Sequence, residues 1–354
     1  MTVLITGGAG FIGSALVRHL IEASSHAIVN VDRLTYAANP ASLADLADHP
    51  RYRLEQVDIT DAAAVTRCFA EHRPTTVLHL AAESHVDRSI DRPAEFIRTN
   101  VVGSYTMLEA ATRYCEGLSA GERTRFRFVH VSTDEVFGSL GDSGAFTLDS
   151  PYRPASPYSA TKASADHLAR AWHSTFGLPV LVTNCSNNYG PRQFPEKLIP
   201  LTILNALEGR PVAVYGTGKN VRDWLHVEDH VAGLVAAMER GTPGETYLFG
   251  GGAERKNLEV VRAICQLVDR LAGPLPSRVA RTSLIQFVAD RPGHDFRYAI
   301  DPSHARQALA WAPSRTFEEG LTQTVEWYLT HRDWWEPARR AQHQGQRLGL
   351  GAGA

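Results

Sequence analysis

Five residues in two short stretches of the chain have the types and spacing of a proton-transferring site. Thr133, Asp134 and Glu135 directly follow an apolar run that predicts a buried strand. Adjacent carboxylates at the end of such a strand are costly unless they face a polar cleft. Tyr158 and Lys162 stand four residues apart, which places them one turn apart on one face of a helix. We interpret the five residues as one catalytic set.

Tyrosine is a weak base at neutral pH because its pKa is about 10. A neighbouring ammonium and a positively charged nicotinamide both lower that pKa, and the pair Tyr158 and Lys162 supplies such an arrangement. Lys162 can also hold a nicotinamide ribose. The spacing Y-x-x-x-K alone is weak evidence, because many helices contain it by chance.

The pair Asp134 and Glu135 distinguishes the predicted chemistry from a plain hydride transfer, which needs one base. Two close carboxylates push one pKa upward, so one can serve as acid and the other as base at the same pH. The competing interpretation is an acid pair that faces solvent or caps a loop.

A dinucleotide-binding unit is predicted at the N-terminus. The apolar run Thr2–Thr6 precedes glycines that satisfy G-x-G-x-x-G, and a second run, Ala27–Val31, ends at Asp32. Small residues let the backbone approach a pyrophosphate at the positive end of the following helix. Asp32 can accept hydrogen bonds from the adenosine ribose, which favours NAD over NADP, although Arg33 weakens that preference. The alternative is a structural turn with a solvated acid.

Strands and helices alternate through the first half of the chain. Further strands are predicted at Tyr52–Val57, Thr76–Leu80, Phe126–Val131 and Leu178–Thr183, and helices at Asp61–His72, after Pro93 and at Pro157–Phe176. This order predicts an α/β fold, a Rossmann-type doubly wound parallel sheet, with a smaller, irregular C-terminal substrate-binding part. Ligands collect beyond the carboxyl ends of such strands, where Gly7, Asp32, Asp58, Ala81 and Thr133 fall.

Three parts are expected along the chain. Residues 1–185 form the NAD-binding Rossmann domain. Residues 186–335, which begin with polar loop sequence, mainly bind substrate, with some segments returning to the main fold. Residues 336–354 form a C-terminal arm.

Bulk composition argues against several classes of protein. The net charge of −2 favours neither nucleic acid nor an anionic membrane, and no apolar stretch is long enough to cross a bilayer. The four cysteines are scattered without a CxxC pair, which is typical of reduced cytoplasmic proteins. His226 and His230 flank Glu228, but this is not the zinc-protease order, so we expect no metal site.

Sequence blocks spread over nearly the whole chain carry a family resemblance. They are residues 6–13, 81–89, 132–138, 158–162, 184–190, 194–200, 222–224 and 290–295. Through them the chain resembles the dTDP-glucose 4,6-dehydratases, a nucleotide-sugar dehydratase group of the extended short-chain dehydrogenases/reductases. The glycine loop and YxxxK occur across that superfamily, whereas Thr-Asp-Glu with the Asn-Asn-Tyr-Gly and Phe-Pro-Glu-Lys blocks is specific to this group.

The resemblance implies a three-stage reaction on one bound NAD. Tyr158 takes the proton of the sugar C4 hydroxyl while hydride leaves C4, with Thr133 hydrogen-bonded near C4. The new ketone acidifies C5–H, so Glu135 removes that proton and Asp134 protonates the departing C6 hydroxyl. Hydride then returns to C6 while C5 is reprotonated. The implied product is dTDP-4-keto-6-deoxyglucose, with no net consumption of cofactor.

Binding residues follow from the same resemblance and from the strand ends. Expected cofactor contacts are Gly7, Gly10, Phe11, Ile12, Gly13, Asp32, Asp58, Ile59, Ala81, Ala82, Thr99, Tyr158, Lys162 and Asn188. Expected substrate contacts are Ser84, Asn187, Glu196, Lys197, Leu198, Tyr215, Arg222, Asn257, Arg291 and His294. A homodimer built on the two long helices is also implied. Many relatives carry a tyrosine in the C-terminal arm where this chain has His343.

Two other functions remain open. A nucleotide-sugar 4-epimerase shares the fold, NAD and the Tyr/Lys pair, but generally lacks Asp-Glu after the Thr-like residue. A non-catalytic NAD-binding sensor would be expected to lose Tyr158 or Lys162, and both are present.

Overall fold

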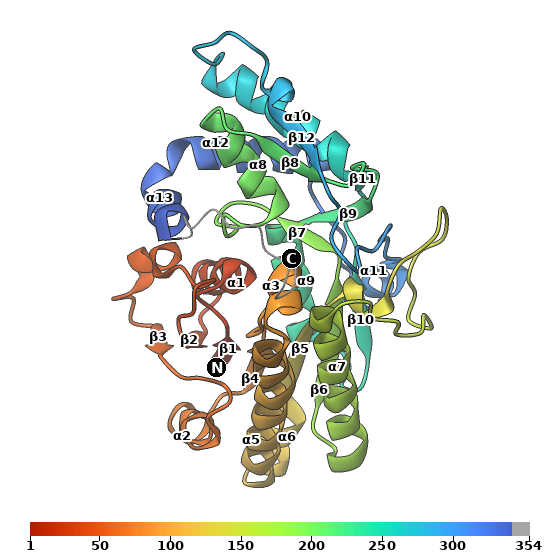
Figure 1. The fold of residues 1–354 in the computed structure, drawn as a ribbon. Helices are drawn as coiled ribbons and strands as arrows, with labels where there is room; N and C mark the ends of the chain where they lie inside the picture. The colour runs from red at the N-terminus through yellow and green to blue at the C-terminus, as the bar shows by residue number, and fades with distance from the viewer. Residues whose placement is uncertain (342–354) are drawn as a thin grey trace.

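The computed structural model describes residues 1–341 and has a seven-stranded parallel sheet at its centre (Figure 1). The strand order is β10-β6-β5-β4-β1-β2-β3. The strands are β1 (Thr2–Thr6), β2 (Ala27–Val31), β3 (Tyr52–Glu55), β4 (Thr76–His79), β5 (Arg127–Thr133), β6 (Val180–Cys185) and β10 (Thr246–Phe249). The strand order runs one way from β1 through β2 to β3 and the other way from β4 through β5 to β6, which makes this the predicted doubly wound α/β sheet.

Helices cover both faces of this sheet. The helices are α1 (Phe11–Ala23), α2 (Ala62–His72), α5 (Ser104–Glu116), α7 (Pro157–Phe176) and α9 (Val227–Arg240). Side chains alternate along β1, so Val3 and Ile5 pack with α1 and α9 in one core. Leu4 packs with α2, α5 and α7 in the other. Both faces are therefore dry, as the apolar runs of the strands predict.

The helix predicted after Pro93 is interrupted. It begins as α4 (Pro93–Phe96), continues as a π-helical segment, η3 (Ile97–Gly103), and becomes α5. Within the segment, Asn100 accepts from the Glu83 N–H (2.8 Å) and donates to the Thr161 hydroxyl (2.9 Å). A π-helical turn often marks a functional site, and here it ties the helix to α7 and to the loop after β4.

Helix α7 is capped at both ends. Ser156 and Ser159 form a capping box, and Pro157 occupies the first turn, where its missing N–H costs nothing. At the other end, Gly177 adopts the left-handed conformation that closes the helix. These signals fix the register of the helix that carries Tyr158 and Lys162.

Most of the C-terminal half forms a second layer above the sheet, whereas β6, β10 and α9 belong to the main sheet and its covering helices (Figure 1). It contains a three-stranded sheet of β7 (Asn187–Tyr189), β9 (Val221–His226) and β11 (Glu254–Lys256), and a pair of β8 (Val212–Tyr215) and β12 (Ile285–Val288). Around them pack α8 (Leu198–Leu207), α10 (Asn257–Ala272), α12 (Phe317–Thr330) and α13 (Arg332–Ala341). This half is more regular than its proline and glycine content suggests, because α8, α10 and α12 share one apolar core.

The remaining elements are short. They are α3 (Val86–Asp91), α6 (Ala120–Arg125), α11 (Ser303–Leu309), η1 (Pro40–Ser42), η2 (Ala44–Leu46), η4 (Asp134–Phe137) and η5 (Arg281–Leu284). Among the described residues, none of the helices has the length and apolar character needed to cross a membrane. The four cysteines are buried and unpaired. His343, the residue singled out in the C-terminal arm, lies outside the described residues.

Candidate active site

The five residues of the predicted catalytic set line one cavity. Thr133 is the last residue of β5, and Asp134 and Glu135 begin the turn η4 that follows it. The Thr133 hydroxyl accepts from the Glu135 N–H (3.3 Å), lies 3.3 Å from Asp134 Oδ1, and hydrogen-bonds the Tyr158 phenol. Thr133 therefore links Asp134 and Glu135, at the end of β5, to Tyr158 on α7.

Asp134 and Glu135 have different surroundings. Asp134 Oδ2 is buried and has no hydrogen-bond partner among the described residues. Burial and neighbouring carboxylates raise the pKa of Asp134 well above its usual range, which favours its protonated form. Burial also raises the pKa of Glu135, but Arg291, Arg222 and Lys197 oppose that rise. The arrangement suits Asp134 to donate a proton and Glu135 to accept one.

The Tyr158 phenol is buried beside Glu135. Burial and the nearby Glu135 carboxylate raise the pKa of Tyr158 well above its usual value, which is the direction opposite to the one predicted from the Tyr/Lys pair. The Lys162 ammonium donates to the Val131 carbonyl (2.8 Å), and the desolvation of the phenol outweighs its attraction. The positive nicotinamide ring, which the prediction includes as the second charge, would act against this rise.

The glycine loop has the shape that a pyrophosphate needs. Gly7 has a φ of +73°, and a Cβ on it would lie 2.8 Å from the Ala81 backbone. A Cβ on Gly13 would lie 2.1 Å from the Gly7 carbonyl oxygen. Gly10 is the N-cap of α1 and offers no capping side chain, so the first N–H groups of the helix remain available to an anion.

Acidic and basic side chains surround the end of β2. The Asp32 carboxylate accepts from the N–H groups of Ala9 (3.0 Å) and Leu34 (2.8 Å), which fixes it beside the glycine loop. Arg33 pairs with Asp58 (3.1 Å) and Glu83 (3.1 Å). Because two carboxylates already engage the Arg33 guanidinium, it weakens the preference for NAD less than the sequence suggests.

Every residue predicted at the cofactor except Asp58 lines the cavity, namely Gly7, Gly10, Phe11, Ile12, Gly13, Asp32, Ile59, Ala81, Ala82, Thr99, Tyr158, Lys162 and Asn188. The Asp58 carboxylate instead accepts from Arg33 and from the Thr60 hydroxyl (2.8 Å). The loop after β2 adds Thr35, Ala37 and Ala38 to the lining, which sequence reasoning missed. The rule that ligands collect at the carboxyl ends of strands would have found them.

The predicted substrate residues divide into two groups. Ser84, Asn187, Glu196 and Lys197 line the cavity, and Lys197 Nζ donates to the Ser84 carbonyl (2.9 Å). The residues outside its lining are Leu198, Tyr215, Arg222, Asn257, Arg291 and His294.

Asp87 hydrogen-bonds two residues of that second group, Arg291 and Tyr215. It accepts from Arg291 Nη1 (3.0 Å) and from the Tyr215 hydroxyl (3.1 Å), and the His294 ring packs edge-on against Tyr215. Sequence reasoning did not single out Asp87 as a binding residue. The Arg222 guanidinium lies over the Tyr298 ring at 4.2 Å. The positive charges of this group act on Glu135, which places the group beside the cavity.

Leu198 and Asn257 begin helices. Leu198 is the first residue of α8 and directly follows Lys197. Asn257 is the first residue of α10, and its side-chain Oδ1 is buried without a hydrogen-bond partner among the described residues.

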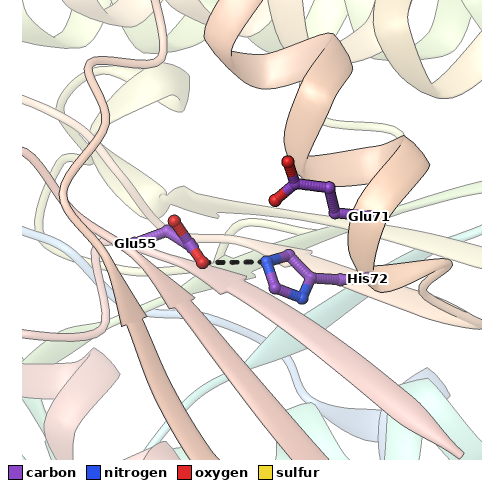
Figure 2. Close-up of side chains that lie close together, drawn as sticks. All are labelled: Glu55, Glu71 and His72. Atoms are coloured by element: carbon purple, nitrogen blue, oxygen red, sulfur yellow. Dashed lines mark hydrogen bonds and ion pairs between the residues drawn. The ribbon is translucent and has the colours of Figure 1, made fainter.

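One cluster outside the cavity has side chains of the metal-ligating types. Figure 2 shows Glu55 at the end of β3 beside Glu71 and His72 at the end of α2. Glu55 Oε1 is already bonded to His72 Nε2 (2.9 Å) and to Arg53 Nε (2.7 Å). We therefore interpret the cluster as an ion-pair network and assign no metal to it.

Comparisons with known proteins agree with this geometry. The protein-family model described as GDP-mannose 4,6 dehydratase matches residues 4–324. The dTDP-glucose 4,6-dehydratase of Neisseria meningitidis serogroup B is 56% identical over 351 residues, which are 99% of each chain. The crystal structure of the dTDP-glucose 4,6-dehydratase of Streptomyces venezuelae with NAD and TYD bound is 43% identical, with a TM-score of 0.87 over 96% of this chain and 100% of that one. The Thermus thermophilus UDP-glucose 4-epimerase in complex with NAD is 28% identical, with a TM-score of 0.81 over 94% of this chain and 100% of that one.

Proposed function

The chain belongs to the dTDP-glucose 4,6-dehydratases, and from that premise we propose that it converts dTDP-glucose to dTDP-4-keto-6-deoxyglucose and water on one bound NAD. The observation that carries the proposal is the position of Asp134 and Glu135, which open into the same cavity as Tyr158 and the glycine loop. A dehydration needs an acid and a base beyond the hydride-transfer site, and this pair supplies them.

The alternative functions fit less well. The similarity to a UDP-glucose 4-epimerase is distant, at 28% identity. An epimerase moves no proton at C5, so it would have no use for the Asp134 and Glu135 pair. A non-catalytic sensor would have no reason to keep Tyr158 and Lys162, and both line the cavity.

Cofactor binding is assigned to the carboxyl ends of the strands. Gly7, Gly10 and Gly13 let the backbone approach the pyrophosphate. Asp32 accepts hydrogen bonds from the adenosine ribose, and Lys162 holds the nicotinamide ribose. Residues 1–185 thus bind mainly NAD and residues 186–335 mainly the nucleotide sugar.

The reaction follows from the proton affinities of the side chains. When bound, NAD brings a positive ring into the cleft, accepts a hydride from the sugar C4 and returns it at C6. Tyr158, hydrogen-bonded to Thr133, takes the proton of the C4 hydroxyl. Glu135 takes the C5 proton, which the new ketone acidifies, and the surrounding cations Arg291, Arg222 and Lys197 favour its ionised form for that step. The raised pKa of Asp134 favours its protonated form, which gives its proton to the departing C6 hydroxyl, and C5 is reprotonated as the hydride returns to C6.

The nucleotide is tested by comparing dTDP-, UDP- and GDP-glucose as substrates of the purified protein. With dTDP-glucose and no added reductant, we expect a 4-keto-6-deoxy sugar, detected by mass spectrometry as the loss of one water. We expect slower turnover with the other two sugars. Clean epimerisation at C4 without dehydration would overturn the proposed function.

We further propose a homodimer formed by the two long helices. Ile97 and Tyr105, on η3 and α5, and Phe176, at the end of α7, are 53%, 45% and 51% exposed although they are apolar. Tyr105 and Phe176 both contact the Trp172 ring, so these side chains form one apolar surface. A second copy of the chain covers such a surface well, because apolar patches of this kind mark protein contacts.

Replacing Phe176 by glutamate is expected to shift the protein from dimer to monomer in sedimentation velocity. The charge would be buried without a partner in the dimer, whereas it is solvated in the monomer. Phe287→Glu is the matched control, because Phe287 is 58% exposed on β12, away from the two helices. A Phe176→Glu protein that sediments as the wild type would exclude this surface.

A further inference from the structure

Asp166 is a fully buried carboxylate outside the cavity lining, one turn beyond Lys162 on α7. It accepts hydrogen bonds from His130 Nε2 (3.0 Å), the Ser132 hydroxyl (2.9 Å), the Tyr152 hydroxyl (2.7 Å) and Asn184 Nδ2 (3.2 Å). We propose that Asp166 is a positioning residue for the dehydration, because it fixes the strand end that carries Thr133 and balances the charge of Lys162. This inference rests on the proposed function.

The hydrogen bonds of Asp166 reach the catalytic set through two neighbours of Thr133. Ser132 precedes Thr133 on β5, and Asn184 is the register partner of Ser132 on β6. Asn184 Nδ2 bonds both the Asp166 carboxylate and the Thr133 carbonyl (3.0 Å). The Asp166 carboxylate therefore fixes the end of β5 in two ways, directly through Ser132 and indirectly through Asn184 on the adjacent strand β6. Since the Thr133 hydroxyl contacts Asp134, Glu135 and Tyr158, a shift at this end would move all three contacts.

Electrostatics give Asp166 a second effect, on Lys162. Burial lowers the pKa of Lys162, and the Asp166 carboxylate opposes that fall. The groups that face this pair are His79 on β4, His130 on β5, Cys185 on β6, Tyr152 before α7 and Arg170 further along α7. Burial lowers the pKa of both histidines, which favours their neutral forms, and the Lys162 ammonium lowers the pKa of Asp166.

Removing the charge of Asp166 should therefore change the titration of Lys162. Asp166→Asn keeps the size of the side chain and removes the anion, so the pKa of Lys162 falls. Lys162 is one of four lysines, with Lys197, Lys219 and Lys256, so its side-chain Cε signal can be assigned and titrated by NMR with ¹³C-labelled lysine. We expect the pKa of Lys162 to fall by about one unit, which is roughly a tenfold change in its proton affinity.

Kinetics provide the second readout. In full-length Asp166→Asn, we expect kcat for dTDP-glucose to fall roughly tenfold or more, because positioning of Thr133 and the charge of Lys162 both act on proton transfer. KM should stay close to the wild-type value, since Asp166 does not line the cavity. The alkaline limb of the kcat–pH profile should move to lower pH, because Lys162 then loses its proton earlier.

Tyr152→Phe is the matched control, because it removes one hydrogen bond to Asp166 and keeps the charge. Its Lys162 titration and its alkaline limb should match the wild type. If Asp166→Asn does not accumulate as folded protein, Asn184→Ala tests the positioning effect, because Asn184 bonds both Asp166 and the Thr133 carbonyl and lies outside the cavity lining. It should lower kcat with little change in KM.

Two results would overturn the inference. One is a Lys162 titration and alkaline limb that are unchanged in Asp166→Asn, and the other is a wild-type kcat in Asn184→Ala. The NMR titration needs no substrate, so it tests the effect of Asp166 on Lys162 even if the wild-type protein fails to dehydrate dTDP-glucose.

Discussion

Replacing Tyr158 by phenylalanine is expected to lower the turnover of dTDP-glucose by roughly 10²–10⁴-fold, the usual contribution of a positioned general base. The phenol is the group within hydrogen-bond reach of Thr133 that can take the C4 proton. Phenylalanine keeps the edge-on packing against Phe96, so the fold and the cavity should persist. In a single-turnover experiment with NAD-loaded protein, the absorbance of reduced nicotinamide should fail to appear on mixing with dTDP-glucose.

Tyr247→Phe is a suitable control for the loss of a buried hydroxyl. The Tyr247 hydroxyl accepts from the Thr242 N–H (2.9 Å), and the residue lies on β10 outside the cavity lining. Its turnover should match the wild type. Rapid formation of reduced nicotinamide in Tyr158→Phe would assign the C4 proton to another group and remove Tyr158 from this role.

The fold could be predicted largely from periodicity and glycine placement. Most strands of the first half were found because they are apolar and are followed by a glycine, an acid or a small residue. The strand β10 was not found, because Thr246–Phe249 is short and is separated from the other sheet strands by about sixty residues of the second layer. Its pairing with β6 depends on tertiary contacts that no local pattern records.

The interruption of the helix after Pro93 could not be predicted either. The apolar stripe through Ile97, Val101 and Tyr105 is equally compatible with a regular helix. The π-helical segment is where Asn100 bonds Glu83 and Thr161, and these partners come from other elements. A long-range contact therefore decides the local structure.

The site was predictable where its chemistry is local in sequence. Asp134 and Glu135 are adjacent, and Tyr158 and Lys162 lie one helical turn apart, so both pairs could be identified from the sequence alone. The pKa of Tyr158 was not predictable, because it depends on burial and on Glu135 rather than on the neighbour four residues away. Asp166 and Asp87 could not be identified as site residues from the sequence for the same reason, since their partners lie on other strands and loops.

Replacing Glu135 by glutamine should separate the first step of the reaction from the second. Tyr158 and Thr133 are unchanged, so oxidation at C4 should still occur and reduced nicotinamide should accumulate on the protein. Glutamine cannot accept the C5 proton, so exchange of that proton with solvent should stop and overall turnover should fall by roughly 10²–10⁴-fold. In deuterated water, mass spectrometry of the recovered sugar would show no label at C5.

Asp134→Asn should give the opposite result, so the two variants together test whether Asp134 is the acid and Glu135 the base. Burial favours the protonated form of Asp134, so the asparagine variant loses the proton that the C6 hydroxyl needs, while Glu135 remains free to act as a base. C4 oxidation and C5 exchange should both continue, and the loss of water should fail. If Glu135→Gln incorporates deuterium at C5 as fast as the wild type, or if Asp134→Asn is the variant that loses exchange, the roles given to the two carboxylates are wrong. The opposite patterns expected of two neighbouring residues cannot arise from a general loss of stability, which would lower both reactions in both variants.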